Sequence, residues 1–505
     1  MLPYTEQSVQ LMHEGSLALA QVEHDGIRMD VGYLKGAIKK TERRIARLER
    51  RLEKSEVCVE WKKAYGSKMK LGSDEQLGKV LFDRMGFKSP GKTESGQHKA
   101  DESSLAKVDH PFIQDYLKVK KLKKALSTNL NGLLALTVDE YLHPTFSLHV
   151  TKTYRSSSEA PNFQNQPVRN EMLAELIRRA FVARPGNHLV ELDYSGLEVN
   201  IAACYHKDPT MLEYLGDETK DMHRDCAMDL YMLEQEEVTK QIRYYGKNGF
   251  VFPEFYGDWY IDCARALWEA IDKFHLVTAS GTPLREHLAS KGIRRLGALV
   301  PGEKPVKGTF EYHVCKVERH FWEDRFPVYA QWRKDWFTQY QKKGWFLTKT
   351  GFICQGYMKK NEAINYPVQG SAFHCLLWSL TRLVLQELPK KKMKALIVGQ
   401  IHDSIVADVP PEELDDFLAL AQHVMTTLLM SIWDWIIVPL KIEADVSPIG
   451  GSWVDKKPYD LSGIAKPRVR KKWKRYEPGT PEWMSYWKAH PEDQEEMVNY
   501  TRRIK

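Results

Sequence analysis

The chain has 505 residues, a length that predicts two to four domains or one large unit with several lobes. Hydrophobic residues make up 43% and charged residues 28% of the chain, and no run of about 18 apolar residues occurs, so we expect a globular protein without a transmembrane helix. The net charge of +7 favours a polyanionic partner, and the seven scattered cysteines form no CxxC pair, which argues against a zinc site and for a reducing compartment.

Residues 1–150 are predicted to be mostly helical. In "LKGAIKKTERRIARLERRLEK" (34–54) the apolar residues fall on one helical face, and the opposite face is dense in Lys and Arg. The basic face is either a solvated surface or a surface that meets phosphates. The stretch "YLKVKKLKKAL" (116–126) leaves the same alternatives open, and "GKTESGQHKADESS" (91–104) predicts a loop between the two helices. The apolar positions of the first helix are Leu34, Ile38, Ile45, Leu48 and Leu52.

Strand patterns begin after residue 145. "TFSLHVTKTY" (145–154) alternates as a strand does, and "HLVELDYS" (188–195) is a short apolar strand that delivers Asp193. Helical spacing returns over 258–275, and the Gly- and Pro-rich stretch 279–308 predicts an irregular insertion. "KALIVGQIHDSIVADV" (394–409) predicts a hairpin with His402, Asp403 and Ser404 at its polar tip.

Two aspartates, Asp193 and Asp403, therefore stand at the ends of strand-like segments. Carboxylates that are brought together repel unless cations join them. Two Mg²⁺ ions held by carboxylates can clamp the attacking and leaving oxygens of a phosphoryl transfer. The pattern alone leaves two unrelated surface aspartates as the alternative.

Four further stretches carry side chains suited to nucleotides. "RSSSEAPNFQNQPVRN" (155–170) is rich in groups that hydrogen bond to bases, sugars and phosphates. In "RYYGKNGFVFPEFYG" (243–257), Arg243 and Lys247 lie one helical turn apart, which suits a triphosphate, and the aromatic residues that follow suit stacking. "NEAINYPVQGSAFH" (361–374) places Asn365 and Gln369 on one helical face, and "KDMHRD" (220–225) adds a His-Arg pair.

In this order, these stretches resemble the DNA polymerase I family, family A. "DYSGLE" is similar to its motif A, "QIHDS" to its motif C, and "R…K…F…YG" to motif B, its fingers helix. "SSSEAPNFQNQPVRN" is similar to the SSxxPNxQNxPxRN signature, and "VEHDGIRMDVGYL" and "PIGGSW" resemble the beginning and the end of the polymerase region. The resemblance covers about residues 1 to 453, and six motifs in the right order make it specific.

The resemblance implies an α+β right-hand polymerase with a palm made of an antiparallel sheet plus helices, helical fingers and a helical thumb. It divides the chain into a basic, mostly helical thumb that grips the minor groove (1–150), a first palm part with motif A (151–215), fingers with motif B and an insertion (216–360), and a second palm part with motif C (361–453). The basic range 454–505 is either a charged surface extension or a segment that docks on DNA or a partner.

The resemblance also implies the site. Asp193 and Asp403, with the backbone carbonyl of Tyr194, would hold two Mg²⁺ ions, for which Mn²⁺ can substitute. Glu198 would exclude a ribose 2′-hydroxyl, and His402 would hold the primer end or the hairpin. The implied nucleotide-binding set is Glu198, His223, Arg243, Lys247, Phe252 and Tyr256. The implied DNA-binding set is Arg155, Asn162, Gln164, Asn165, Asn365, Gln369 and His402.

The implied activity is template-directed DNA synthesis, in which dNTPs are added to a primer 3′-hydroxyl on a primer–template. No intrinsic 3′–5′ exonuclease is expected, because thumb-like sequence begins within the first residues. A separate proofreading exonuclease or processivity factor is a candidate partner, and no membrane contact is expected. We expect the cytoplasm as the location, that of a host cell if the polymerase is phage-type.

The chain departs from the family pattern at several positions. Motif B has four residues between Lys247 and Phe252 where three are usual, and Pro253 stands where glycine is usual. A one-residue bulge or a kink at Pro253 would restore the register, and Phe250 is the fallback for the aromatic residue. Gly196 replaces a frequent glutamine, and Ser404 replaces a frequent glutamate, which leaves one carboxylate fewer near the metals.

Two other functions remain open at this point. "HDS" also occurs in the single-subunit phage-type RNA polymerases, although Glu198 and "PNFQNQP" argue for DNA synthesis. A non-catalytic clamp on a polymerase fold would require the loss of a metal aspartate, and both aspartates are present.

Overall fold

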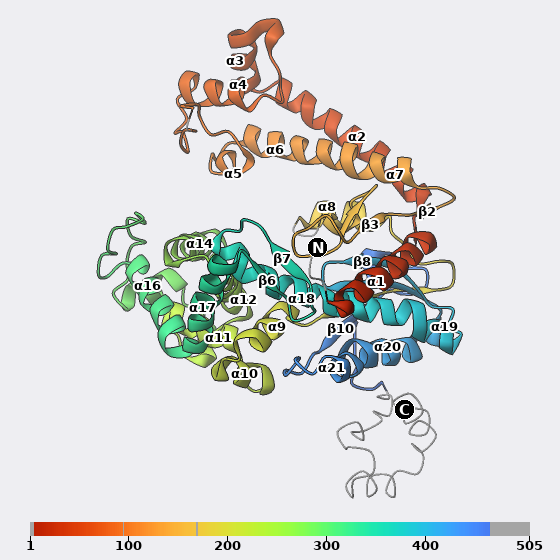
Figure 1. Cartoon of the computed structure of the whole chain (residues 1–505). Coiled ribbons are helices and arrows are strands. Elements are labelled where there is room, and N and C mark those ends of the chain that lie inside the picture. Colours follow the sequence, from red (N-terminus) through yellow and green to blue (C-terminus); the bar gives the residue numbers. More distant parts are fainter. Residues whose placement is uncertain (1–4, 94, 168–169, 465–505) are drawn as a thin grey trace, which may run out of the picture.

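The computed structural model of the chain describes residues 5–93, 95–167 and 170–464. Part of the predicted C-terminal extension, from 465 onward, and residues 168–169 of the signature lie outside the described residues. Helices dominate the structure, and the sheets are small and antiparallel, so the predicted α+β class is confirmed (Figure 1). Every helix within the described part of the chain is too short or too polar to span a bilayer.

A five-stranded antiparallel sheet lies at the centre of the molecule, in the order β11-β10-β5-β9-β8. The predicted strand and hairpin are confirmed as β5 and as β8 with β9. β11 lies in the range predicted as an extension, and its pairing with β10 makes it part of the sheet. The strands are β5 (His188–Tyr194), β8 (Leu396–Ile401), β9 (Ser404–Val409), β10 (Ile442–Val446) and β11 (Lys457–Tyr459).

Long helices pack beside this sheet (Figure 1). α1 (Glu6–Asp25) contacts both α18 (Lys360–Arg382) and β8, and its buried residues belong to the same hydrophobic core as the sheet. The other helices and strands around it are α8 (Glu171–Arg178), α19 (Leu388–Lys391), α20 (Leu414–Gln422), α21 (Leu429–Ile432), β1 (Ile27–Arg28) and β2 (Tyr141–Leu142).

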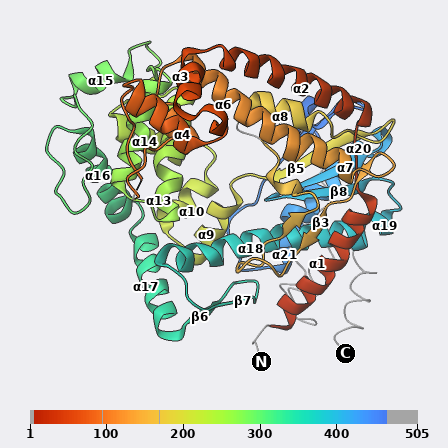
Figure 2. The same cartoon turned by 90° about the horizontal axis from the view of Figure 1, so that it is seen from above.

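A helical arm, residues 31–136, rises above the sheet and has a hydrophobic core of its own. The predicted helical face is confirmed, because Leu34, Ile45, Leu48 and Leu52 are buried and Ile38 is half-buried. Figures 1 and 2 together show that the far end of the arm, α3 and α4, lies above the helical group that contains α14. The arm consists of α2 (Val31–Glu53), α3 (Glu56–Tyr65), α4 (Asp74–Gly78), α5 (Glu102–Leu105), α6 (Pro111–Lys124) and α7 (Gly132–Leu136).

A second helical group lies to the side of the sheet, shown in yellow-green and green in Figure 1. α14 confirms the helix predicted over 258–275, and 279–308 is irregular apart from α15. The helices are α9 (Leu197–His206), α10 (Pro209–Gly216), α11 (Met222–Tyr231), α12 (Lys240–Gly246), α13 (Phe252–Tyr256), α14 (Tyr260–Lys273), α15 (Leu284–Ser290), α16 (Phe310–His320) and α17 (Pro327–Lys343), followed by the hairpin of β6 (Trp345–Leu347) and β7 (Ile353–Gln355).

One predicted strand is wrong over most of its length. Of the range 145–154, only β3 (Thr145–Ser147) is a strand, paired with β4 (Ser157–Glu159). The chain then turns: Thr151 Oγ1 donates to the Arg155 carbonyl at 2.8 Å, and Tyr154 has a φ of 56°. Positive φ is incompatible with a strand, so alternation of residue types alone was misleading here. The division into thumb, palm and fingers stays a prediction.

Candidate active site

The two predicted carboxylates meet at one edge of the central sheet. Asp193, the penultimate residue of β5, is in register with Ser404, the first residue of β9, and with Glu443 of β10. The turn between β8 and β9 places Asp403 immediately before Ser404, and the Tyr194 amide donates to the Asp403 carbonyl at 3.4 Å. The structure therefore brings Asp193 and Asp403 together.

Neither carboxylate is fully compensated by the protein. Although the Asp193 side chain reaches solvent, desolvation by the surrounding protein and then the negative charges of Asp403 and Glu443 raise its pKa to about 6. Burial also raises the pKa of Asp403 to about 6, although the nearby Arg155 opposes this. Oδ1 of Asp403 is buried without a hydrogen-bond partner, and Nη2 of Arg155 is 3.7 Å away from it. Hard divalent cations prefer such oxygen ligands, so the donor set fits Mg²⁺.

The metal ligands available in the protein are few. The Tyr194 side chain is buried and hydrogen bonds to Ser379 and to the Met425 carbonyl, so only the backbone of Tyr194 is available to a metal. In the described part of the chain, no cluster of three or more His, Cys, Asp or Glu side chains has the arrangement of a metal site. The protein thus offers a metal ion two carboxylates, Asp193 and Asp403, and the backbone carbonyl of Tyr194.

Glu198 is held next to this pair by a polar network. Tyr256 Oη donates to Glu198 Oε2, and Nη2 of Arg155 lies 3.4 Å from Glu198 Oε1. Asn365 Nδ2 donates to the Tyr256 carbonyl at 3.0 Å. Gly196, with φ of 63°, begins α9 and turns the chain sharply after β5, a conformation that glycine adopts without strain. This turn places Glu198 in the first turn of α9.

A small pocket lies beside Glu198. Five predicted site residues line it together with Phe255 and Tyr329: Glu198, Phe252, Tyr256, Asn365 and Gln369. The lining is mostly apolar with a few polar groups, as is usual for small-molecule sites. Side chains from α9, α13 and α18, which are far apart in the sequence, are therefore combined in one cavity.

The predicted one-residue bulge in motif B is present. A π-helical segment, η6 (Lys247–Val251), joins α12 to α13, and a π turn contains one residue more than an α turn. Nζ of Lys247 consequently lies 4.9 Å from the centroid of the Phe252 ring. The extra residue is absorbed before Pro253, so Lys247 and Phe252 stay on the same side of the segment.

The two glycines of motif B allow this segment to pack closely. A Cβ on Gly249 would lie 2.6 Å from Leu267 Cδ2 of α14, and one on Gly246 would lie 3.0 Å from Ala227 Cβ of α11. The low helix propensity of glycine is thus offset by close approach to both neighbouring helices.

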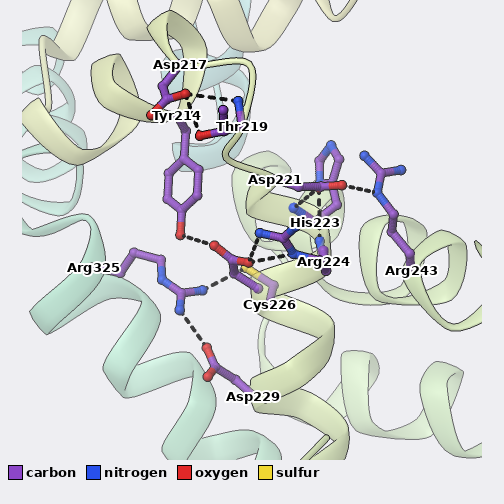
Figure 3. A network of polar contacts seen from close by, with 11 residues as sticks. Tyr214, Asp217, Thr219, Asp221, His223, Arg224, Cys226, Asp229, Arg243 and Arg325 are labelled. Carbon is purple, nitrogen blue, oxygen red and sulfur yellow. Dashed lines mark hydrogen bonds and ion pairs between the residues drawn. The ribbon is translucent and has the colours of Figure 1, made fainter. Parts of the chain in front are cut away.

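Two of the predicted phosphate-binding residues, His223 and Arg243, contact Asp221 (Figure 3). Asp221 Oδ1 accepts from the amides of His223 and Arg224 at 3.0 Å, and its Oδ2 accepts from Arg243 Nε at 2.6 Å. The His223 ring meets the Phe252 ring edge-on at 5.7 Å. Burial, then the positive charges of Lys247 and Arg243, lower the pKa of His223 to about 4. Arg243 and Lys247 together carry more positive charge than Asp221 neutralises, which suits an anionic group.

The remaining predicted DNA-binding residues lie around the β8–β9 turn. Gln164 Nε2 donates to Ser156 Oγ and to Gln400 Oε1, each at 2.7 Å, and Gln400 Nε2 donates to the His402 carbonyl at 2.7 Å. Asn162 accepts from the Asn165 amide at 3.1 Å and so fixes a local turn. His402 and Asn165 have exposed side chains. Gln164 therefore supports the turn that carries Asp403.

Sequence reasoning missed several residues of this region. Gln400 lies within "QIHDS" and could have been named from that motif. Glu443 could have been found by extending the strand alternation of "KIEADV" to a third strand beside Asp193. Tyr329 of α17 lines the pocket, but it lies outside every recognised motif, so no sequence signal pointed to it.

The sequence model of DNA polymerase family A matches residues 38–268 and 336–455, and the chain belongs to that family. This membership confirms the resemblance found from the motifs. The segment 269–335 lies between the two matched ranges.

Relatives match over most of this chain. The thermostable DNA polymerase I of Thermus aquaticus is 28% identical over 461 residues, which is 88% of this chain and 47% of that protein. The DNA polymerase of Bacillus phage SP01 is 27% identical over 83% of this chain and 47% of its own length. DNA polymerase I of Bacillus subtilis is 27% identical over 88% of this chain and 45% of its own length. The chain spans about half the length of these relatives.

A solved structure shares the fold. The polymerase domain of Pol1 from M. smegmatis, in complex with DNA primer-template and dNTP, superposes with a TM-score of 0.66 and 24% sequence identity. The superposition covers 88% of this chain and 70% of that one.

Proposed function

We propose that this chain is a DNA-directed DNA polymerase that adds dNTPs to the 3′-hydroxyl of a primer paired with a template. The observation that carries the proposal is that Asp193 and Asp403 lie side by side and that Arg155 lies near both Asp403 and Glu198. A primer-extension assay with dNTPs and rNTPs in parallel tests it. Preference for rNTPs would favour an RNA polymerase, and no extension with either would favour a non-catalytic clamp.

In this proposal Asp193, Asp403 and the Tyr194 carbonyl hold two Mg²⁺ ions. The unpartnered, buried Oδ1 of Asp403 and the mutual repulsion of the two carboxylates support this assignment. When bound, two such ions supply a lowered pKa for the primer hydroxyl and charge neutralisation for the leaving pyrophosphate. Arg155, which lies near one oxygen of each, would orient Asp403 and Glu198.

His223, Arg243 and Lys247 would bind the triphosphate, with Asp221 fixing the direction of Arg243. Phe252 would pack under the incoming sugar and base, and Tyr256 would support the template base pair. The pocket beside Glu198 supports both roles, because Phe252 and Tyr256 line it. The DNA-binding roles of the residues around the β8–β9 turn and on α18 remain part of this proposal. They are Arg155, Asn162, Gln164, Asn165, Asn365, Gln369 and His402.

Primer–template and dNTP are proposed as the substrates, in line with the ligands in the complex of the Pol1 domain from M. smegmatis. The cytoplasmic location, a separate processivity factor and a separate exonuclease stay predictions. The absence of 3′–5′ exonuclease activity in this chain is tested by incubating it with a primer that has a mismatched 3′ end. Shortening of that primer at a rate above that of a mock preparation purified without this chain would contradict the prediction.

Replacing Phe252 by tyrosine is expected to increase dideoxynucleotide incorporation. A dideoxynucleotide leaves the partner of the missing 3′-hydroxyl unsatisfied, at a cost of roughly 1–3 kcal/mol, and a tyrosine hydroxyl in the pocket can replace that group. Phe252 lines the pocket, whereas Phe250 is fully buried and packs on Phe321. The measurement is the ratio of dideoxynucleotide to deoxynucleotide incorporation.

Phe250→Tyr is the matched control for this experiment. We expect it to lower the melting temperature without changing the incorporation ratio, because its hydroxyl would be buried without a partner. Relaxed selectivity in Phe250→Tyr alone would show that Phe252 has the wrong register for the sugar contact.

A further inference from the structure

Two carboxyl groups meet in the protein interior behind α13. Glu254 of α13 is only 1% exposed, and its side chain hydrogen bonds to that of Glu318 on α16. Trp322 Nε1 donates to Glu254 Oε2 at 2.8 Å, and Cys263 Sγ lies 3.7 Å from Glu254 Oε1. The Tyr260 amide donates to Glu318 Oε1 at 2.8 Å. A carboxyl–carboxyl hydrogen bond requires a proton on one of the two groups.

Among the described residues, no Lys or Arg forms an ion pair with Glu254 or Glu318. Arg333 of α17 is the nearby positive group, and its guanidinium lies over the Trp322 ring, 4.2 Å from the centroid. Burial, then the charge of Glu318, raises the pKa of Glu254 to about 8, and burial also raises the pKa of Glu318. Two carboxylates this close cannot both ionise cheaply, so they titrate as a pair.

The pair lies behind the helix that carries the proposed substrate contacts. α13 is five residues long, and Glu254 lies between Phe252 and Tyr256. One side of α13 faces the pocket beside Glu198, and another side faces a second hollow lined by Asn248, Asp258 and Asn361, among others. The position of α13 therefore depends on its contacts on the side away from the two hollows.

The partners of Glu254 come mainly from a segment that the family match leaves out. Glu318 and Trp322 both lie within 269–335, between the two matched ranges. Phe255, the next residue of α13, packs on Phe321 and Trp322 of the same segment. The segment 269–335 thus contributes both apolar and polar contacts to the back of α13.

We propose that Glu254 and Glu318 are positioning residues, and that one proton shared between them fastens α13, and with it Phe252 and Tyr256, to α16 and the turn after it. Loss of that proton to solvent base leaves two buried carboxylates that repel each other, and α13 moves away from its support. This inference rests on the proposed polymerase function for its kinetic consequence. The shared proton itself does not depend on that function.

The kinetic test compares the wild type with Glu254→Gln over a pH series from 6 to 9. Glutamine can donate to Glu318 and accept from Trp322 without titrating. We expect the dNTP KM of the wild type to rise above pH 8 by up to about tenfold at pH 9 relative to Glu254→Gln, because one unit above a pKa near 8 corresponds to a factor of ten. The contribution of the primer hydroxyl to the pH profile is common to both proteins and cancels in the ratio.

Glu323→Gln is the matched control, since Glu323 is exposed and follows Trp322 directly. It should keep the pH profile of the wild type. If Glu254→Gln does not fold, Glu318→Gln takes its place, because either substitution removes the need for a shared proton. Identical KM profiles in the wild type and the glutamine variant would overturn the positioning role.

Thermal unfolding supplies a readout that does not require activity. The folded-state pKa of Glu254, about 8, lies above its ordinary value of 4.5, so its stabilising effect is full below pH 4.5 and is lost as the pH rises through 8. The melting temperature of the wild type should therefore fall with pH relative to Glu254→Gln. Parallel curves would overturn the shared proton. Divergent curves with an inactive wild type would refute the polymerase function instead.

Discussion

Replacing Asp193 or Asp403 by alanine is expected to abolish nucleotide addition, a loss of about three orders of magnitude or more, while primer–template affinity changes little. Electrostatic stabilisation at the reacting atoms is usually the largest catalytic contribution, and both carboxylates lie where β5 and the β8–β9 turn meet. Affinity for DNA comes mainly from phosphate contacts made elsewhere. The measurements are single-nucleotide extension at saturating enzyme and DNA binding at the same salt concentration.

The asparagine variants Asp193→Asn and Asp403→Asn separate lost chemistry from lost structure. Each carboxylate has a folded-state pKa of about 6, above the ordinary 3.8, so without metal the native state loses stability as the pH rises through 6. A neutral asparagine does not suffer this loss. We therefore expect the metal-free variants to melt no lower than the wild type at neutral pH. Extension at near wild-type rates by any of the four variants would contradict the assignment of the two aspartates.

The positions of Asp193 and Asp403 at strand ends could be predicted from the sequence, because each aspartate interrupts an apolar strand pattern. An apolar strand that ends in a carboxylate can be read from a few residues, and so can a hairpin with a polar tip. The extra residue of motif B was also readable against the family pattern, which left a one-residue bulge or a kink at Pro253 open, and the π segment Lys247–Val251 is such a bulge. Local chemistry that is encoded by neighbours along the chain is thus recoverable without a structure.

Contacts between distant elements were not recoverable in this way. Nothing near Glu254 in the sequence indicates that it meets Glu318, and a glutamate in a short helix is usually expected to face solvent. Tyr329 reaches the pocket only because α17 packs against α9, with Asp208 accepting from the Tyr329 amide at 3.0 Å. The strand predicted over 148–154 was wrong for the opposite reason. Its alternation is local, but positive φ at Tyr154 turns the backbone away from a strand.

The second large effect is expected at Glu198. Glu198→Ala should lower the preference for dNTPs over rNTPs by about two orders of magnitude, because it removes the side chain that fills the space of a 2′-hydroxyl. Glu198 lines the pocket, with Tyr256 Oη donating to one carboxylate oxygen and Arg155 lying 3.4 Å from the other. These two contacts fix the carboxylate in place. The measurement is kcat/KM for a matched dNTP and rNTP pair.

Two variants show whether the volume of the Glu198 side chain or its hydrogen bond with Tyr256 produces the selectivity. Glu198→Gln keeps the volume and should retain most of the selectivity, whereas Tyr256→Phe removes only the donor. Burial and then the Glu198 carboxylate raise the pKa of the Tyr256 hydroxyl, so it remains a donor at every pH of the assay. If Tyr256→Phe lowers the dNTP preference as much as Glu198→Ala does, the hydrogen bond contributes more to the selectivity than the side-chain volume. Unchanged selectivity in an active Glu198→Ala protein would place the gate elsewhere and favour the RNA polymerase alternative, because Glu198 is the residue that distinguishes the two in this site.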